Sequence, residues 1–305
     1  MNRSRAVIML IFDAALSGFG YILLEIALQS HLSPALVVML RGVFATALCF
    51  FLYHKQIRTI TKREFWIGTF LGILNFIGFI LTTVSMELST PSNTSFLLSS
   101  GIILVPFIDF LFHKKRPSKK AVLSAVLGIV GIAVLSGIFS TGFVFNFGNL
   151  LAFLGAVVFS LHITFVGKYA TEIHHQKMVF FMMFYLMVGG FIYALFVPGS
   201  FSLANVSLLP TLLSTLGLGI GASFMYFLIQ VTAQMHVSAT TASLVLSSDA
   251  LFTSVLSILF GFEQLTPELV LGGLIITAAI ILLEMPIKKR NAKAESLHPA
   301  DKPRR

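Results

Sequence analysis

The feature that most constrains the fold is a succession of apolar runs, each close to the length that crosses a lipid bilayer. Charged residues make up only 11% of the 305 residues, whereas 56% are hydrophobic. Soluble proteins carry about a quarter of their residues as charges, so this composition leaves too little polar surface to cover a water-soluble globule. We therefore predict an all-α polytopic membrane protein.

Proline, glycine, asparagine and clusters of charge divide the apolar sequence into ten candidate transmembrane helices, each near the roughly 20 residues that a crossing needs. The expected spans are 6–28, 33–54, 65–86, 91–113, 120–139, 147–168, 178–197, 208–230, 237–260 and 266–285. Prolines fall at or near four of the starts, where a missing backbone N–H costs little. No small-residue cleavage site follows the first run, so we interpret it as a retained membrane helix.

Of the 21 Lys and Arg residues, 20 fall at the termini or in the loops on one side of ten such helices. The loops on the other side, near His31, Glu87, Asn146, Asn205 and Glu263, contain none. By the positive-inside rule, both termini are expected in the cytoplasm and the protein in the cell (cytoplasmic) membrane. The basic tail at 286–305 is expected to fix this topology and meet anionic lipid rather than bind nucleic acid.

A shift of the chain by 148 residues reveals an internal repeat. Ser95–Ser100 then aligns with Ser243–Ser248, and the register continues without a gap to give ten identities over 41 positions. The two repeats, 6–139 and 147–285, would each hold five helices, and an odd number turns the second upside down relative to the first. Inverted repeats are typical of secondary transporters, which bind substrate between the halves near mid-membrane. Duplication without transport, as in a membrane enzyme or scaffold, is the alternative.

Four segments, in this order and spacing, resemble the drug/metabolite transporter superfamily, in particular its ten-helix EamA-type exporters. They are Leu16–Tyr21, Leu40–Gly42, Thr90–Ser100 and Phe262–Pro267. The resemblance covers about residues 6–285 and implies two five-helix repeats that move small organic metabolites or amino acids across the cytoplasmic membrane. The chain departs from the family pattern with basic His113–Arg116 after the fourth helix, and with Asp249-Ala250 in place of Glu-Pro in the ninth.

Arg41 is the one basic residue away from the predicted cytoplasmic loops and termini. It lies about eight residues into the second helix, which at 1.5 Å per residue is roughly 12 Å deep. Ionisable groups inside a bilayer are costly, so Arg41 should face a cavity or an acid. We expect it to bind a substrate carboxylate or to pair with Glu25, and a structural Arg–Glu or Arg–carbonyl bond is the alternative.

Asp249 is close to the middle of the ninth helix and follows two serines. We expect it to carry a coupling proton or to bind a substrate amine, whereas a carboxyl satisfied by Ser or Thr hydroxyls is the alternative. Asp13 in the first helix and His162 in the sixth are further candidates for proton or substrate contacts, with a satisfied structural group as the alternative for each. Polar residues that could add contacts in the cavity are Tyr21, Asn75, Asn93, Ser99 and Ser100.

Several function classes lack their sequence signatures. No phosphate-binding loop is present, and the single cysteine, Cys49, excludes an internal disulfide and a cysteine-cluster metal site. We expect no metal site and no cofactor, and a transporter rather than an enzyme. The predicted function is a secondary transporter, an exporter working by alternating access, with protons as a candidate coupling ion. An uncoupled facilitator, an integral-membrane enzyme and a channel are the alternatives. The expected partners are a small-molecule substrate and the lipid bilayer, with no oligomer assigned.

Overall fold

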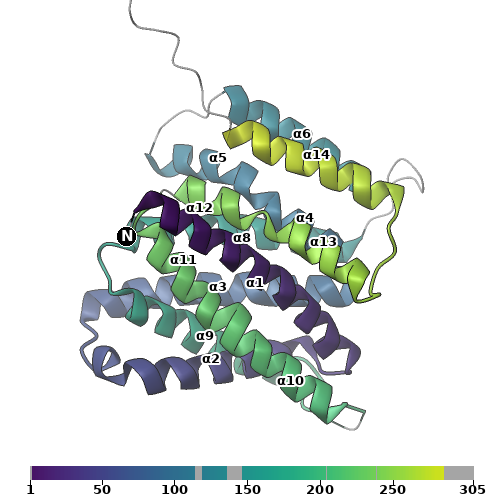
Figure 1. Cartoon of the computed structure of the whole chain (residues 1–305). Helices are drawn as coiled ribbons and strands as arrows, with labels where there is room; N and C mark the ends of the chain where they lie inside the picture. Colours follow the sequence, from purple (N-terminus) through teal and green to yellow (C-terminus); the bar gives the residue numbers. More distant parts are fainter. Residues whose placement is uncertain (1, 114–118, 136–145, 204, 238, 285–305) are drawn as a thin grey trace, which may run out of the picture.

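The computed structural model describes residues 2–113, 119–135, 146–203, 205–237 and 239–284, and within this part every regular element is a helix (Figure 1). In chain order the elements are α1 (Arg3–Gln29), α2 (Pro34–Ile57), α3 (Lys62–Leu88), α4 (Pro91–Ser99), α5 (Gly101–His113), α6 (Lys119–Leu135), α8 (Phe147–Tyr169), α9 (His175–Phe196), α10 (Leu208–Gly219), the π-helix η1 (Ile220–Met225), α11 (Tyr226–Gln234), α12 (Ala239–Leu246), α13 (Asp249–Leu259) and α14 (Pro267–Glu284). The basic loop at 114–118 and the tail at 286–305 lie outside the described residues, so the expectations for them stay predictions.

Helices α2 and α4 begin where the sequence supplies a cap and a proline. The Ser33 hydroxyl accepts a hydrogen bond from the Leu36 N–H, and Pro34 takes the first position of α2. Thr90 and Pro91 repeat this arrangement at the start of α4. A capping oxygen satisfies a backbone N–H that the first turn leaves free, and proline has no N–H to lose there. The prediction that these prolines mark helix starts is confirmed.

Six helical segments of the described chain are long and apolar enough to cross a membrane. They are Arg3–Gln29, Pro34–Ile57, Lys62–Leu88, Phe147–Tyr169, His175–Phe196 and Leu208–Gln234. Shorter apolar helices accompany them at Pro91–Val105, Val122–Gly131, Asp249–Leu259 and Pro267–Ala279. Large apolar side chains such as Phe51 and Phe196 are exposed on the outer surface, which suits contact with lipid. The chain is therefore a multi-pass membrane protein, and the count of ten crossings stays a prediction.

Two segments that we predicted as continuous helices, 91–113 and 237–260, are instead broken near their middles. Helices α4 and α5 are separated at Ser100, and α12 and α13 are separated by Ser247 and Ser248. At each break a serine hydroxyl donates to the carbonyl three residues earlier, at 2.5 Å for Ser100 and 2.6 Å for Ser248. Such local bonds compete with the regular helical ladder. The breaks fall at equivalent positions of the 148-residue repeat.

Helices α2 and α9 cross closely because each provides a glycine at the crossing. A Cβ atom on Gly42 would lie 2.3 Å from the backbone nitrogen of Met187, and one on Gly190 would lie 2.6 Å from the backbone nitrogen of Met39. Small residues allow two membrane helices to approach in this way. Gly42 and Met39 are the positions equivalent to Gly190 and Met187 in the 148-residue repeat, so the crossing joins matching parts of the two halves.

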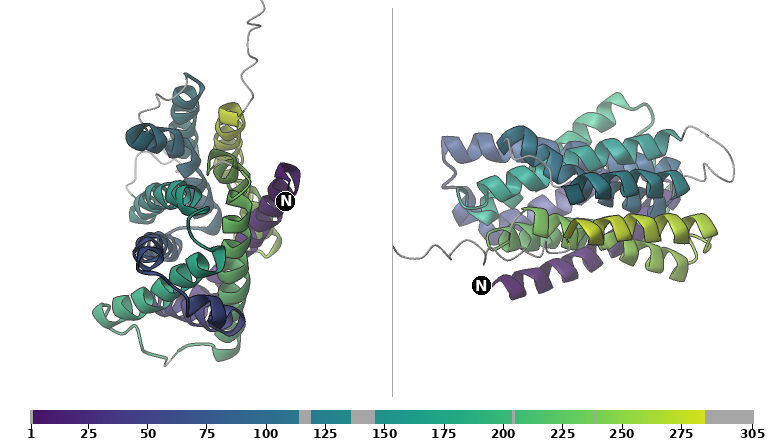
Figure 2. Two further views of the ribbon diagram at one scale, coloured as in Figure 1. Left: turned by 90° about the vertical axis from the view of Figure 1, so that its left-hand side faces the viewer. Right: turned by 90° about the horizontal axis from the view of Figure 1, so that it is seen from above.

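Helices α6 and α14 pack against each other at the opposite edge of the molecule (Figure 1). Gly131 of α6 lies against Ile276 of α14, where a Cβ atom on the glycine would be 2.7 Å from the isoleucine side chain. In Figure 1 this pair lies at the top and α2 and α9 lie at the bottom, with α8 and the broken helices between them. Figure 2 shows the two edges from the side and from above. The elements that form the candidate site lie between these edges.

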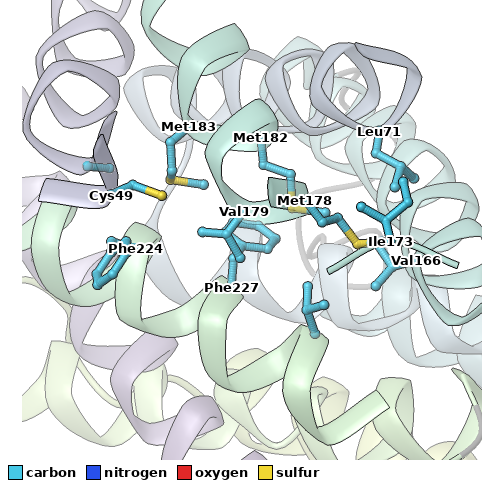
Figure 3. Close-up of a cluster of buried hydrophobic side chains, with 12 residues drawn as sticks. Cys49, Leu71, Val166, Ile173, Met178, Val179, Met182, Met183, Phe224 and Phe227 are labelled. Atoms are coloured by element: carbon cyan, nitrogen blue, oxygen red, sulfur yellow. The ribbon is translucent and has the colours of Figure 1, made fainter. Parts of the chain in front are cut away.

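A methionine-rich core holds α9 against its neighbours (Figure 3). Met178, Met182 and Met183 of α9 are fully buried in one cluster with residues of α2, α3, α8 and α11. Flexible thioether side chains fill irregular gaps between helices. The free thiol of Cys49 is fully buried in the same cluster, so its accessibility reports on whether this core is intact.

Lys177, at the start of α9, is buried against the start of α3. Its Nζ lies 2.9 Å from each carboxylate oxygen of Glu64 and donates to the Thr59 carbonyl oxygen at 2.9 Å. Glu64 also closes a capping box at the start of α3. An exposed ion pair joins Arg63, in the first turn of α3, to Glu172, in the loop before α9, with 2.7 Å between the charged atoms. One residue that we counted as a basic loop charge is therefore half of a buried ion pair.

Candidate functional site

A cavity lies among α1, α2, α3, α8 and α11 and the two helix breaks, with about 900 Å³ of empty space that includes open solvent. The exposed area of its wall is mostly apolar, although twelve of its 25 lining residues have polar side chains. This combination is typical of sites for small molecules, in which the apolar wall provides burial and the few polar groups fix orientation. Two of those polar groups, Arg41 and Asp249, carry charge.

Arg41 enters the cavity from α2 and is only 3% exposed. Its Nε donates to the Ser223 hydroxyl at 3.0 Å, and one Nη donates to the Ala222 carbonyl oxygen at 3.1 Å. Both acceptors belong to η1, and π-helical turns frequently occur at functional sites. The guanidinium carbon lies 4.0 Å from the centroid of the Phe79 ring, which is a cation–π distance. Since arginine has five N–H donors, donors remain for a ligand.

The predicted pairing of Arg41 with Glu25 is not formed. Glu25 lies near the end of α1, half-buried, and accepts a hydrogen bond from Gln29 at 2.8 Å. Within the described residues no carboxylate forms an ion pair with Arg41. A buried charge normally pairs with another charge, whereas the Arg41 guanidinium is held only by neutral acceptors and a ring. Its bond to the Ala222 carbonyl oxygen is the Arg–carbonyl bond of the alternative interpretation.

Asp249 is the first residue of α13 and meets the cavity at the second helix break. Its carboxylate accepts hydrogen bonds from the Ser17 hydroxyl of α1 at 3.1 Å and from the Ser99 hydroxyl of α4 at 2.8 Å. A carboxylate in the first turn of a helix also interacts favourably with the helix dipole. The side chain is thus held by hydroxyls, as one interpretation expected, and it still faces the cavity.

Four rings form a closed set of edge-to-face contacts along the cavity wall. The ring centroids are 5.4 Å apart for Phe79 and Phe159, 6.3 Å for Phe159 and His162, 5.6 Å for His162 and Phe227, and 5.8 Å for Phe227 and Phe79. These separations are within the range of favourable aromatic pairs. The set provides a rigid apolar wall beside the two charged side chains.

Two polar side chains of the cavity have unpaired atoms. Within the described part of the chain, no hydrogen bond reaches either ring nitrogen of His162 or the Oε1 atom of Gln230. His162 is fully buried and Gln230 is almost fully buried. Leaving a buried polar atom unpaired costs roughly 1–3 kcal/mol. A polar group of a ligand in the cavity would remove that cost.

The structure gathers half of the predicted site residues around the cavity. These are Tyr21, Arg41, Ser99, His162 and Asp249. The others, which are not among the residues lining the cavity, are Asp13, Glu25, Asn75, Asn93 and Ser100.

The predicted residues away from the cavity have other surroundings. Asn75 donates to the Met182 carbonyl oxygen at 3.3 Å and so joins α3 to α9. Ser100 bonds its own chain at the helix break, and Asn93 lies in the first turn of α4. Asp13 is fully buried in α1 without a hydrogen-bond partner among the described residues. In the part of the chain that the structure describes, no group of three or more His, Cys, Asp or Glu side chains is placed to hold a metal ion.

Three contributors to the site were not identified from the sequence. Ser17 and Ser223 hold the two charged side chains, and Gln230 presents its unpaired amide oxygen. Gln230 could have been found, because an amide in an otherwise apolar run is costly unless it has a partner. The serines carry no comparable signal, since hydroxyls in membrane helices commonly bond their own backbone.

Comparisons with known proteins agree with one another. The model of the EamA-like transporter family matches the chain twice, at residues 4–137 and 146–285. An uncharacterized transporter of Archaeoglobus fulgidus is 26% identical over 224 residues, covering 73% of this chain and 70% of that protein. A crystal structure superposes with a TM-score of 0.66 at 17% identity, covering 93% of this chain and 97% of that one. This last likeness shows the fold alone.

Proposed function

We propose that the chain, which belongs to the EamA-like transporter family, is a secondary transporter that exports small zwitterionic metabolites, amino acids among them, by alternating access. Family membership supports a membrane transporter and points away from an enzyme. The observation that carries the proposal is a pair of opposite charges, Arg41 and Asp249, that face one cavity and are each held by neutral groups.

The two charges suit the two ends of a zwitterion. The planar guanidinium of Arg41 matches the geometry of a carboxylate, and the Asp249 carboxylate can accept hydrogen bonds from an ammonium group. The four-ring wall that includes Phe79 and Phe227 would contact the apolar part of the molecule.

Contacts between equivalent residues support two repeats, 6–139 and 147–285, related by a two-fold axis. The Ser247 hydroxyl donates to the Ser99 carbonyl oxygen at 3.3 Å, and the rings of Phe79 and Phe227 are in contact. Each pair is 148 residues apart, and residues on a two-fold axis meet their own counterparts. The axis would pass through the cavity, where inverted repeats place their substrate.

A substrate held by Arg41 and Asp249 would bridge the two repeats, because each repeat supplies one of the charges. Binding energy at such a bridge can favour a closed conformation over the open ones. We place the protein in the cell membrane with both termini cytoplasmic, following the distribution of basic residues. An uncoupled facilitator remains the second candidate mechanism, and a pH gradient separates the two.

The test begins with metabolite profiling of cells that overexpress or lack the protein. The compound whose level changes is then assayed for uptake into proteoliposomes, with and without a pH gradient. We expect Arg41→Gln to raise KM by about 10- to 100-fold, since a hydrogen bond to a charged group contributes about 1.5–3 kcal/mol and 1.4 kcal/mol is tenfold. Arg41→Lys keeps the charge but loses the planar fork, so we expect partial loss.

Several outcomes would contradict the proposal. Unchanged KM in Arg41→Gln would show that this side chain is not the anion site. Flux that fails to saturate and shows no counter-transport would indicate a channel instead. Glu87→Gln, an exposed acid near the end of α3, serves as a matched control and should transport as the wild type does.

A further inference from the structure

We propose that the two acids in the middle of the molecule have different tasks: Asp13 holds the coupling proton, and Asp249 binds the cationic group of the substrate. The assignment rests on the proposed transport function for its consequences, but it concerns the state of two side chains that can be measured directly. It predicts exchange of one proton for one substrate.

Asp13 has the surroundings of a neutral carboxyl group. It lies on α1 with no exposed surface, and neither carboxylate oxygen has a hydrogen-bond partner within the described residues. It does not line the cavity. An ionised carboxylate without donors in a low-dielectric interior is very costly, and the group avoids this cost by remaining protonated.

Asp249 has the opposite surroundings. Two hydroxyl groups, from Ser17 and Ser99, donate to its two carboxylate oxygens. Hydrogen bonds donated to a carboxylate favour the charged form, and so does the position of Asp249 in the first turn of α13. Of the two acids, Asp249 is therefore the one equipped to be ionised, and it is also the one that faces the cavity.

Asp13 shares a face of α1 with Ser17, which contacts Asp249, although no hydrogen bond reaches Asp13 within the described residues. Asp13 and Ser17 are four residues apart on α1 and so lie on one face of the helix, and the Ser17 hydroxyl reaches the Asp249 carboxylate at 3.1 Å. Asp13 and Asp249 interact electrostatically. The other titratable group facing Asp13 is Tyr226 of α11, which interacts with both acids. Within the described residues, no Lys, Arg or His is among the groups that interact with Asp13.

The two states of this pair would couple substrate to proton. Two interacting carboxylates resist being charged at the same time. An ammonium group bound at Asp249 neutralises that carboxylate, which removes the repulsion that helps to keep Asp13 protonated. In a conformation of the transport cycle that opens this part of α1 to water, the Asp13 O–H bond can then break, and the water that takes the proton also solvates the carboxylate that forms. When the substrate leaves, Asp13 takes up a proton again, which gives antiport.

Infrared spectroscopy of the purified wild-type protein in lipid tests the assignment without a substrate. The carbonyl stretch of a protonated carboxyl group is separate from the bands of a carboxylate and shifts when D₂O replaces H₂O. At neutral pH we expect this band in the wild type and in Glu87→Gln, and its loss in Asp13→Asn. Asp249→Asn removes the same repulsion that a bound ammonium group would remove, so there the band should be lost at a lower pH than in the wild type. A band that survives Asp13→Asn, or one that titrates identically in Asp249→Asn and the wild type, would overturn the assignment.

Proteoliposomes then test the consequence with the metabolite that the wild type is found to transport. Stimulation by a pH gradient, expected at about fivefold or more from typical coupling free energies, should disappear in Asp13→Asn while exchange at equal pH continues. Asp249→Asn should lower both activities by about 10- to 100-fold at low substrate concentration. Loss of both in a folded Asp13→Asn protein, or persistence of the stimulation, would overturn the assignment. If the wild type transports nothing, the proposed function fails, and the infrared result still decides the state of Asp13.

Discussion

The two helix breaks share a backbone course but differ in the residue that follows. Helix α5 begins with Gly101, whereas α13 begins with Asp249 at the equivalent position of the repeat. The other charge of the cavity shows the same contrast, because Arg41 is equivalent to Gly189. Each charged residue of the cavity thus has a glycine as its counterpart, and each half of the chain contributes one charge.

Packing explains why the counterparts are glycines. A Cβ atom on Gly101 would lie 2.8 Å from the Ala156 carbonyl oxygen, and one on Gly189 would lie 2.6 Å from the Phe76 ring. Helix α8 and α3 fill the space that a side chain would need. The repeated backbone thus provides the frame of the cavity, and departures from the repeat make its polar groups asymmetric.

The largest loss of transport is expected when the charges of Arg41 and Asp249 are removed together. Arg41→Gln combined with Asp249→Asn should lower transport at low substrate concentration by about 10²- to 10⁴-fold, since each charged contact contributes about 1.5–3 kcal/mol and 1.4 kcal/mol is tenfold. Initial rates in proteoliposomes measure this loss, with the two single variants for comparison. If the double variant transports no more slowly than the slower of the two single variants, the two side chains do not hold one substrate.

A second asymmetry is the ion pair of Glu64 with Lys177, whose equivalent positions hold the uncharged Leu212 and Gln29. Lys177→Met leaves a buried carboxylate unpaired, which should lower the free energy of unfolding by about 3–5 kcal/mol. Reaction of buried Cys49 with a thiol-sensitive dye during heating reports the loss. Adding Glu64→Gln should restore most of it, and failure to recover would assign the loss to packing rather than to charge.

Filling the glycine counterparts should damage packing without adding charge. Gly101→Ala and Gly189→Ala are expected to lower the free energy of unfolding by about 1–3 kcal/mol, the usual range for overpacking. The same dye measurement applies. Gly221→Ala is the matched control, because its Cβ atom would lie 3.5 Å from Leu16, an ordinary contact. Equal effects at all three positions would remove steric exclusion as the reason for the asymmetry.

The equivalent rings Phe79 and Phe227 contact each other and are expected to differ in function. Either change to Leu loses an aromatic contact worth about 0.5–1.5 kcal/mol. Phe79→Leu also removes the ring beneath the Arg41 guanidinium, so it should raise KM more than Phe227→Leu does. Substrate titrations of the two variants side by side decide this, and a larger effect at Phe227 would contradict the view that Phe79 supports the anion site.

The smallest effect is expected at the serine pair on the proposed axis. Ser247→Ala removes a 3.3 Å hydrogen bond to the Ser99 carbonyl oxygen, which should cost about 0.5–1.5 kcal/mol of stability and leave KM nearly unchanged. Ser99→Ala should instead alter KM, because the Ser99 hydroxyl holds the Asp249 carboxylate. Similar KM values in the two variants would show that this bond does not position Asp249.

The site residues that the sequence predicted best are the charged ones that lie within apolar segments. Arg41 and Asp249 are conspicuous because a charged residue in an apolar run needs a partner or a cavity, and both line the cavity. Asp13 was predictable as buried on the same ground, but its separation from the cavity was not. The sequence suggests Glu25 as a partner for Arg41 and Asn93 as a polar contact in the cavity. Both lie near helix ends, where polar residues are common, so the signal is weak.

The helix breaks show where prediction from hydropathy stops. A window of apolar residues containing Ser100 or Ser248 looks the same whether the helix continues or breaks, because a serine hydroxyl can bond its own backbone in either case. What distinguishes the two is the neighbouring structure. Gly101 abuts α8, and Asp249 receives hydroxyls from α1 and α4.

The amino-acid sequence alone predicts that the chain lies in lipid, that it is helical and that it contains a repeat. Apolar runs of bilayer length can satisfy their backbone groups in lipid only by forming helices, and the 148-residue register follows from direct alignment. The packing of the helices, by contrast, shows which polar groups meet. It shows that Arg41 of α2 bonds to η1 rather than to Glu25, and that Asp13 has no hydrogen-bond donor within the described residues. The physical reason is that composition fixes how a segment is solvated, whereas the rotation and crossing of packed helices fix which side chains face one another.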